Sequence, residues 1–268
     1  MIAFAHLLAI LLYVGAAALA AAPFARPVSA PVRPVVGALA LGVVAHVVAL
    51  VSVGRLNHQL PLAGLGPSLS FAGLVLALTL LAAEAAAREV SLTLVAAPLA
   101  AVATGIAAVI GLRPVQEPSG LAGVWLNAHI ALSFVGIAAF GTAAAAGTMY
   151  LVERRELKSR RFGPVFRFFP PLDTLDRVNH VAAVAGWLVL TFGVVLAISY
   201  SLAYRSADTL KVVWATGAWL AVTAVALGRM LGGWQARRAA WVSSVCFAAV
   251  VALYVAFRLA GPSGGQFL

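Results

Sequence analysis

Residues 124–152 read VWLNAHIALSFVGIAAFGTAAAAGTMYLV, an apolar run without Asp, Glu, Lys or Arg. A helix needs about 20 mostly apolar residues to cross the hydrocarbon core of a bilayer. The run is longer than that, which predicts a membrane-spanning helix that tilts or projects beyond the lipid. Because lipid offers no partner for backbone N–H and C=O groups, the rest of the membrane-embedded chain is expected to be helical too.

Seven further apolar stretches flank this run. They cover residues 2–22, 35–53, 68–87, 91–112, 181–203, 210–231 and 239–259. Together they predict an all-α polytopic integral membrane bundle of about eight transmembrane helices, forming a single domain over residues 1–268. The composition agrees, because 63% of the residues are hydrophobic and 10% are charged, whereas soluble chains have about a quarter charged residues.

The same composition excludes several classes of protein. A single cysteine, Cys246, rules out a disulfide scaffold, a cysteine zinc site and a CxxCH haem-attachment site in this chain. The net charge of +10 does not require nucleic acid as a partner, because membrane proteins collect Lys and Arg on their cytoplasmic loops. We therefore expect the lipid bilayer, and no nucleic acid, as a partner.

The basic residues also predict the orientation of the chain. Thirteen of the 18 Lys and Arg residues fall on one side of the predicted topology, seven of them in the segment Glu153–His180. The positive-inside rule makes that side cytoplasmic, so both termini are expected on the outer face. No Lys or Arg precedes Arg26, so the first stretch is expected to be a retained helix rather than a signal peptide. The expected location is the bacterial inner (cytoplasmic) membrane.

Histidines in the spans are the main candidates for function, since ionisable groups are costly inside a membrane. The topology places His6, His46, His58 and His129 in the outer half, whereas His180 lies at the cytoplasmic edge. Imidazole is a ligand of haem iron, and two rings from different helices can hold one iron. The alternative is that each histidine only forms a hydrogen bond to a neighbouring helix.

Other residue types could complete a haem site beside His129. Trp125 and Phe134 lie on the same span and would serve as aromatic walls. Arg55 and Arg113 lie in outer loops and could contact the propionates. No Walker loop, GxSxG, HExxH or Gly-rich dinucleotide motif is present, and no nucleophile has an evident base.

A set of ordered motifs resembles the cytochrome c assembly superfamily. Residues 125–133, WLNAHIALS, resemble its WLxxHxxLS segment. Further matches are the histidine helix at residues 44–46, the YL…ER..LK helix exit at 150–158, the PPLxxLER turn at 170–177, the GxxxLTxG helix at 186–193 and the GWRGRR loop at 233–238. This superfamily includes the haem-handling CcsA proteins and the shorter HemX and YpjD-type membrane proteins.

Departures from the family pattern bear on activity. The Trp-rich WWD loop of the full synthases is replaced here by Tyr204–Lys211, and Arg229 stands where the synthases have a histidine. The tail at residues 261–265 lacks their last outer histidine. The resemblance therefore implies the HemX or YpjD-type branch and argues against thioether-forming enzyme activity.

The resemblance implies haem binding or handling in cytochrome c biogenesis or haem homeostasis. It points to haem b near the outer face, with His129 as one axial ligand and His46 as the best candidate for the other. Other cytochrome c assembly or haem-pathway membrane proteins would be the partners. The alternative is a non-enzymatic membrane scaffold or regulator of another haem-pathway protein, without bound haem. A small-molecule transporter is a third option, although no inverted repeat supports it.

Overall fold

The computed structural model describes residues 1–25, 31–87, 91–114, 118, 120–160, 168–204 and 209–260. Within these residues, eight helices are long and apolar enough to cross a membrane. They are α1 (Ile2–Ala20), α3 (Val32–Asn57), α4 (Leu65–Ala87), α5 (Thr93–Ile110), α6 (Leu121–Ser159), α8 (Leu172–Tyr204), α9 (Thr209–Met230) and α10 (Ala236–Ala260). A short helix, α2 (Ala22–Ala25), follows α1. The prediction of an all-α, multi-pass membrane protein is confirmed.

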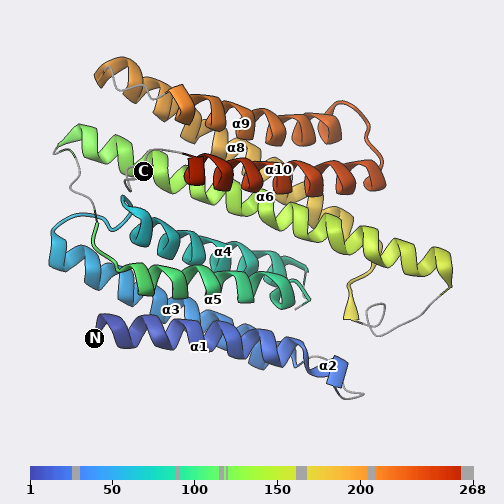
Figure 1. Ribbon diagram of the computed structural model, residues 1–268. Coiled ribbons are helices and arrows are strands. Elements are labelled where there is room, and N and C mark those ends of the chain that lie inside the picture. Colours follow the sequence, from blue (N-terminus) through green and yellow to red (C-terminus); the bar gives the residue numbers. More distant parts are fainter. Residues whose placement is uncertain are drawn as a thin grey trace.

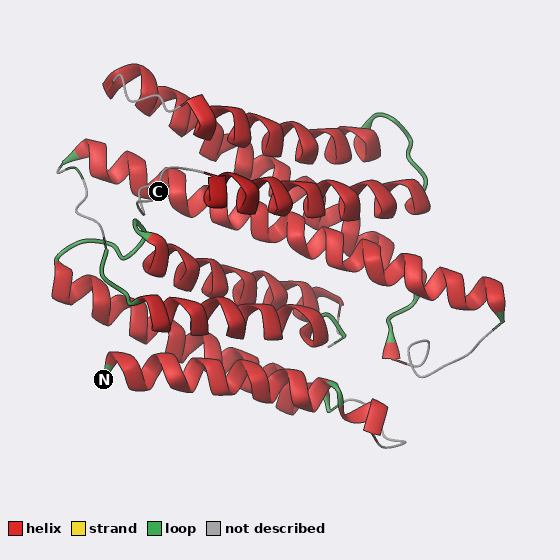
Figure 2. Cartoon of the chain, viewed as in Figure 1, coloured by secondary structure: helices red, strands yellow, loops and turns green. Residues whose placement is uncertain are grey.

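The long helices form two groups that lie side by side. Figure 1 shows α1, α3, α4 and α5 in one group and α6, α8, α9 and α10 in the other. Figure 2 shows the described loops that connect successive helices in green. Helix α1 begins and α10 ends at the same end of the bundle (Figure 1), which we call the predicted outer end. Its outward orientation, like the single domain, stays a prediction.

Apolar contacts join the two groups at both ends. Near the predicted inner end, Met149 of α6 and Leu175 of α8 belong to the same buried cluster as Tyr13 of α1. Near the predicted outer end, the rings of Phe71 of α4 and Phe134 of α6 meet edge to face, with centroids 5.8 Å apart. The first group therefore sets the position of α6, the helix that carries His129.

Helices α6 and α8 pack closely because glycines face each other between them. A Cβ atom on Gly186 of α8 would lie 2.8 Å from the carbonyl oxygen of Gly136 on α6 and 3.1 Å from the backbone nitrogen of Phe140. Real side chains do not fit at such distances from backbone atoms. Small residues of this kind let membrane helices approach until their backbones are in contact.

The start of α8 and the α4–α5 hairpin differ in detail from what the sequence suggests. The N-cap pattern at Asp173–Asp176 suggests a short helix that leads into the sixth span, but α8 begins at Leu172 and continues without a break. An acidic residue suits that position, because the N-terminus of a helix is electropositive. In the α4–α5 hairpin, the buried carboxylate of Glu84 accepts hydrogen bonds from the backbone N–H and the hydroxyl of Thr93, both at 2.7 Å. Arg88, which the sequence suggests as a partner of Glu84 one helical turn away, lies outside the described residues.

Candidate functional site

The side chain of His129 lies between α6 and α8, with one ring nitrogen already engaged. Its Nδ1 is 2.8 Å from the carbonyl oxygen of Gly193 on α8. A carbonyl only accepts, so Nδ1 carries the proton and donates it, and Nε2 is left as the basic nitrogen. Metal-binding histidines are commonly oriented in this way, by donating the other N–H to a carbonyl or carboxylate.

Gly193 can reach His129 because it has no side chain. A Cβ atom there would lie 3.1 Å from Oγ of Ser133 and 3.3 Å from the backbone nitrogen of Ser133. These distances are tighter than ordinary van der Waals contact, so a larger residue would push α8 away from α6. The glycine therefore brings the carbonyl within hydrogen-bond distance of the imidazole.

His129 lines an apolar cavity of about 410 Å³ between α6, α8 and α9. A cavity of this size is in the range of small-molecule and cofactor sites. Its other lining residues include Ile130, Ser133, Phe134 and Ile137 of α6, Leu190, Val194 and Ile198 of α8, and Val212, Trp214 and Ala218 of α9. A ligand here would meet aliphatic and aromatic walls and a single imidazole.

The donor set of this cavity fits a haem with one histidine ligand. Haem iron takes an imidazole nitrogen as an axial ligand, and His129 has Nε2 available for this role because Nδ1 is bound to Gly193. The macrocycle requires apolar surroundings, which residues such as Phe134 and Leu190 provide. The lining thus supplies an axial ligand and apolar walls for the group that the sequence resemblance implies, and among the described residues it holds no basic side chain for the propionates.

His46 lies in a different environment, in the group formed by α1, α3, α4 and α5. Its ring is fully buried and is held by two hydrogen bonds. The phenol oxygen of Tyr13 lies 3.1 Å from Nδ1, and Oγ of Ser70 lies 2.9 Å from Nε2. The ring of His6 packs edge-on against it, with centroids 5.0 Å apart. The structure therefore brings His46 together with His6, not with the cavity-lining residues around His129.

His46 and the three side chains around it form one hydrogen-bonded chain. Oγ of Ser70 also lies 2.8 Å from Nε2 of His6, so the single hydroxyl links both imidazoles. A hydroxyl has one proton and two lone pairs, so it can serve both rings at once, either as donor to one and acceptor from the other or as acceptor from both. Nδ1 of His6 is buried and has no hydrogen-bond partner among the described residues. We call His6, Tyr13, His46 and Ser70 the His6–His46 cluster.

Sequence reasoning identifies the two histidines of this cluster as candidates but not the residues that join them. His6 and His46 are predicted near the outer face, whereas nothing in the sequence singles out Tyr13 or Ser70. A lone Tyr and a lone Ser in apolar helices carry no distinctive spacing. Only the tertiary contacts between α1, α3 and α4 show that their polar atoms meet.

The remaining predicted site residues lie away from the lining of the cavity. Arg55, in the last turn of α3, and Arg113, after the end of α5, are both exposed. Trp125 is half-buried on α6, and its ring packs edge-on against Tyr204 of α8, with centroids 6.5 Å apart. None of the three residues lines the cavity that His129 lines.

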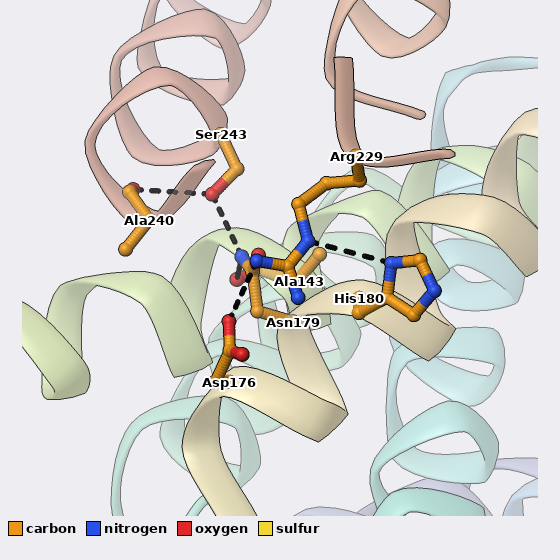
Figure 3. A network of polar contacts seen from close by, with 7 residues as sticks. All are labelled: Ala143, Asp176, Asn179, His180, Arg229, Ala240 and Ser243. Carbon is orange, nitrogen blue, oxygen red and sulfur yellow. Dashed lines mark hydrogen bonds and ion pairs between the residues drawn. The ribbon is translucent and has the colours of Figure 1, made fainter. Parts of the chain in front are cut away.

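The predicted inner end contains a polar network around Arg229, shown in Figure 3. The guanidinium of Arg229 on α9 forms an ion pair with Asp176 of α8, with a nitrogen–oxygen distance of 2.9 Å. Its Nε donates to Nδ1 of His180 at 3.4 Å. His180 is therefore engaged in connecting α8 to α9.

Asn179 extends this network to two other helices. Its Nδ2 donates to the carbonyl oxygen of Ala143 on α6 at 2.7 Å and to Oγ of Ser243 on α10 at 2.8 Å (Figure 3). The side chain is buried, with 1% of its surface exposed. Interhelical hydrogen bonds of this kind hold membrane helices together. They join α6, α8 and α10 at the predicted inner end, whereas the cavity that His129 lines is nearer the predicted outer end.

The fold and the site together define the class of protein. It is a multi-pass membrane protein in which a histidine, held in one orientation by a hydrogen bond, lines an apolar cavity. The chain matches the family described as cytochrome C assembly protein over residues 32–263. It belongs to that family, which supports a role in cytochrome c biogenesis or haem handling.

One curated relative gives a short match. An uncharacterized 28.8 kDa protein in the nifR3-like 5′ region of Azospirillum brasilense is 37% identical over 60 residues. The match covers 22% of this chain and 22% of that protein. No solved structure matches the chain.

Proposed function

We propose that this protein binds haem b in the cavity between α6, α8 and α9, with His129 as an axial ligand, and handles it for cytochrome c biogenesis or haem homeostasis. The observation that carries the proposal is the hydrogen bond from Nδ1 of His129 to the carbonyl of Gly193, which orients the ring of a cavity-lining histidine. We place the protein in the bacterial inner membrane, with this cavity toward the outer face.

The chain's own residues would have three roles at this site. The Gly193 carbonyl keeps the proton on Nδ1 and leaves Nε2 basic. Residues such as Phe134 and Leu190 exclude water from the cavity. Trp125 supports the start of α6 through its contact with Tyr204 rather than through the cavity wall. When bound, haem supplies an iron centre whose potential depends on its axial ligands and on burial.

His46 is less suited than His129 to be a ligand of the same iron. Both of its ring nitrogens are engaged, by Tyr13 and Ser70, and the side chain is fully buried. To become the second axial ligand it would have to give up at least one of these hydrogen bonds and reach the other helix group. We therefore assign His129 alone to the iron. Arg55 and Arg113 could meet only propionates that extend out of the cavity.

Replacing His129 by alanine tests this function. We expect detergent-purified wild-type protein to take up added haem and to show a sharp reduced absorption spectrum. In His129→Ala, the affinity should fall by more than the ~10- to 100-fold typical of losing a partner that only orients a metal ligand. Haem titration followed by absorption spectroscopy measures both quantities.

A matched control separates ligation from general damage. His58 is exposed and has a backbone φ of 54°, which asparagine tolerates well, so His58→Asn should bind haem like the wild type. His46→Ala should retain the absorption bands of the His129 complex. A wild-type protein that takes up no haem, or a His129→Ala variant that binds it unchanged, would contradict the proposal.

The second candidate function is that of a scaffold or regulator without bound haem. Helix α6 has 39 residues and is about 58 Å long at 1.5 Å per residue, against about 30 Å of hydrocarbon core. Its far end projects past the neighbouring helices in Figure 1 and carries Arg154, Arg155 and Lys158, all exposed. A projecting, basic helix end is suited to a partner protein, and a haem-free wild type would favour this function.

A further inference from the structure

A second cavity lies on the opposite side of α8, where the two helix groups meet. It has a volume of about 390 Å³ and lies between α4, α6 and α8. Its α8 side is a stripe that begins with the exposed residues Asp173 and Arg177 and continues through Val178, Val181, Ala182 and Ala185. The cavity is therefore charged where α8 begins and apolar along the rest of its length.

The length of this stripe matches one lipid leaflet. From Asp173 to Ala185 the helix rises by about 18 Å at 1.5 Å per residue, and half of the hydrocarbon core is about 15 Å thick. The opposite wall consists of small side chains, among them Ala83 of α4 and Ala139 of α6. Small residues on both sides make the second cavity a groove in which a hydrocarbon chain can lie along α8.

The two charges at the start of α8 are of opposite sign and are one helical turn apart. Side chains at positions i and i+4 of a helix have Cβ atoms about 5–6 Å apart. Within the described part of the chain, neither the Asp173 carboxylate nor the Arg177 guanidinium forms an ion pair, whereas the next acidic residue, Asp176, is bound to Arg229. Both charged groups are thus available to a ligand that carries a cation and an anion close together.

We propose that this groove binds one phosphatidylethanolamine molecule, with its ammonium group on Asp173, its phosphate on Arg177 and an acyl chain along the alanine-rich wall. A purely anionic headgroup would satisfy Arg177 but would be repelled by Asp173. A quaternary ammonium headgroup cannot donate a hydrogen bond to a carboxylate, so choline lipids should bind less well. The proposal does not depend on haem binding.

Native mass spectrometry of the full-length protein tests this inference. The protein is exchanged into mixed micelles with equal amounts of dioleoyl-phosphatidylethanolamine, -phosphatidylglycerol and -phosphatidylcholine, and the retained lipid is identified as the collision energy is raised. We expect one ethanolamine lipid to outlast the other two. Arg177→Gln should weaken its retention about tenfold, as expected for losing one charge-assisted hydrogen bond, and Asp173→Asn should abolish the preference over phosphatidylglycerol.

Two further variants test the apolar part of the groove and control for the loss of a charge elsewhere. Ala182→Leu narrows the apolar part of the groove and leaves both charges in place, so it should also reduce retention. Arg154→Gln removes an exposed charge on α6 outside the groove and should change nothing. Equal retention of all three lipids, preferential retention of phosphatidylglycerol, or retention that is the same in Arg177→Gln as in the wild type would overturn the proposal. Circular dichroism confirms that each variant is folded.

Discussion

Gly186→Leu is expected to destabilise the protein by about 3 kcal/mol, near the upper end for overpacking a close contact. The new side chain would begin 2.8 Å from the carbonyl oxygen of Gly136 and 3.1 Å from the backbone nitrogen of Phe140. Backbone atoms of a helix cannot move aside as a flexible side chain can, so α8 must separate from α6. The measurement is the unfolding midpoint in detergent micelles titrated with sodium dodecyl sulfate.

Gly217→Leu is the matched control for this change. Gly217 lies on α9 and is exposed, and a Cβ atom there would have nothing within 4 Å. Both substitutions raise the intrinsic helix propensity by about 1 kcal/mol, so only the steric effect differs between them. Separation of α6 and α8 should also weaken the hydrogen bond between His129 and Gly193, so haem affinity should fall in Gly186→Leu and not in the control. Equal stability of the two variants would contradict the packing argument.

Ser70→Ala is expected to destabilise the protein by about 2 kcal/mol through the His6–His46 cluster. The Ser70 hydroxyl lies 2.8 Å from Nε2 of His6 and 2.9 Å from Nε2 of His46. Its removal leaves two imidazole nitrogens unpartnered in rings that are 2% and 0% exposed. An unsatisfied buried polar group costs about 1–3 kcal/mol.

Ser52→Ala controls for the loss of a hydroxyl as such. Oγ of Ser52 donates to the carbonyl of Val48 within its own helix, and its removal leaves no buried group unpartnered. We expect a change of less than about 0.5 kcal/mol, as is usual for surface substitutions. Ser70→Ala should keep the haem affinity of the wild type, because the cluster is separate from the cavity of His129. Loss of haem binding in Ser70→Ala would show that the two sites are coupled.

The membrane-spanning helices could be predicted because their cause is local in the sequence. A run such as residues 124–152 is apolar over more than the thickness of the bilayer, and lipid forces such a run to satisfy its own backbone. The observed α6 extends this run at both ends, over Leu121–Ser159. The largest error lay at the start of the sixth spanning helix, where α8 begins at Leu172 rather than at 181. Polar residues such as Asp173 continue a helix outside the lipid, and hydropathy cannot detect that.

The candidate site could be predicted only in part. The sequence pointed to His129 because an imidazole within an apolar span is rare and because its surrounding motif resembles a haem-handling family. It did not indicate Gly193, whose carbonyl orients the ring, since a backbone acceptor has no residue-type signature. The sequence predicts Trp125 as an aromatic wall of the site because it lies on the same span as His129, but its side chain packs on Tyr204 and does not line the cavity.

Hydropathy alone predicts that the chain crosses the membrane, how many helices cross it and which histidines lie at similar depth. Depth follows from counting residues along each span, because a helix rises by a constant 1.5 Å per residue. Whether two histidines at the same depth meet depends on the rotation of each helix and on which helices are neighbours. Side-chain packing between segments far apart in the chain decides both. That packing brings His46 to His6 and Ser70, and it directs His129 to Gly193 and the cavity beside α9.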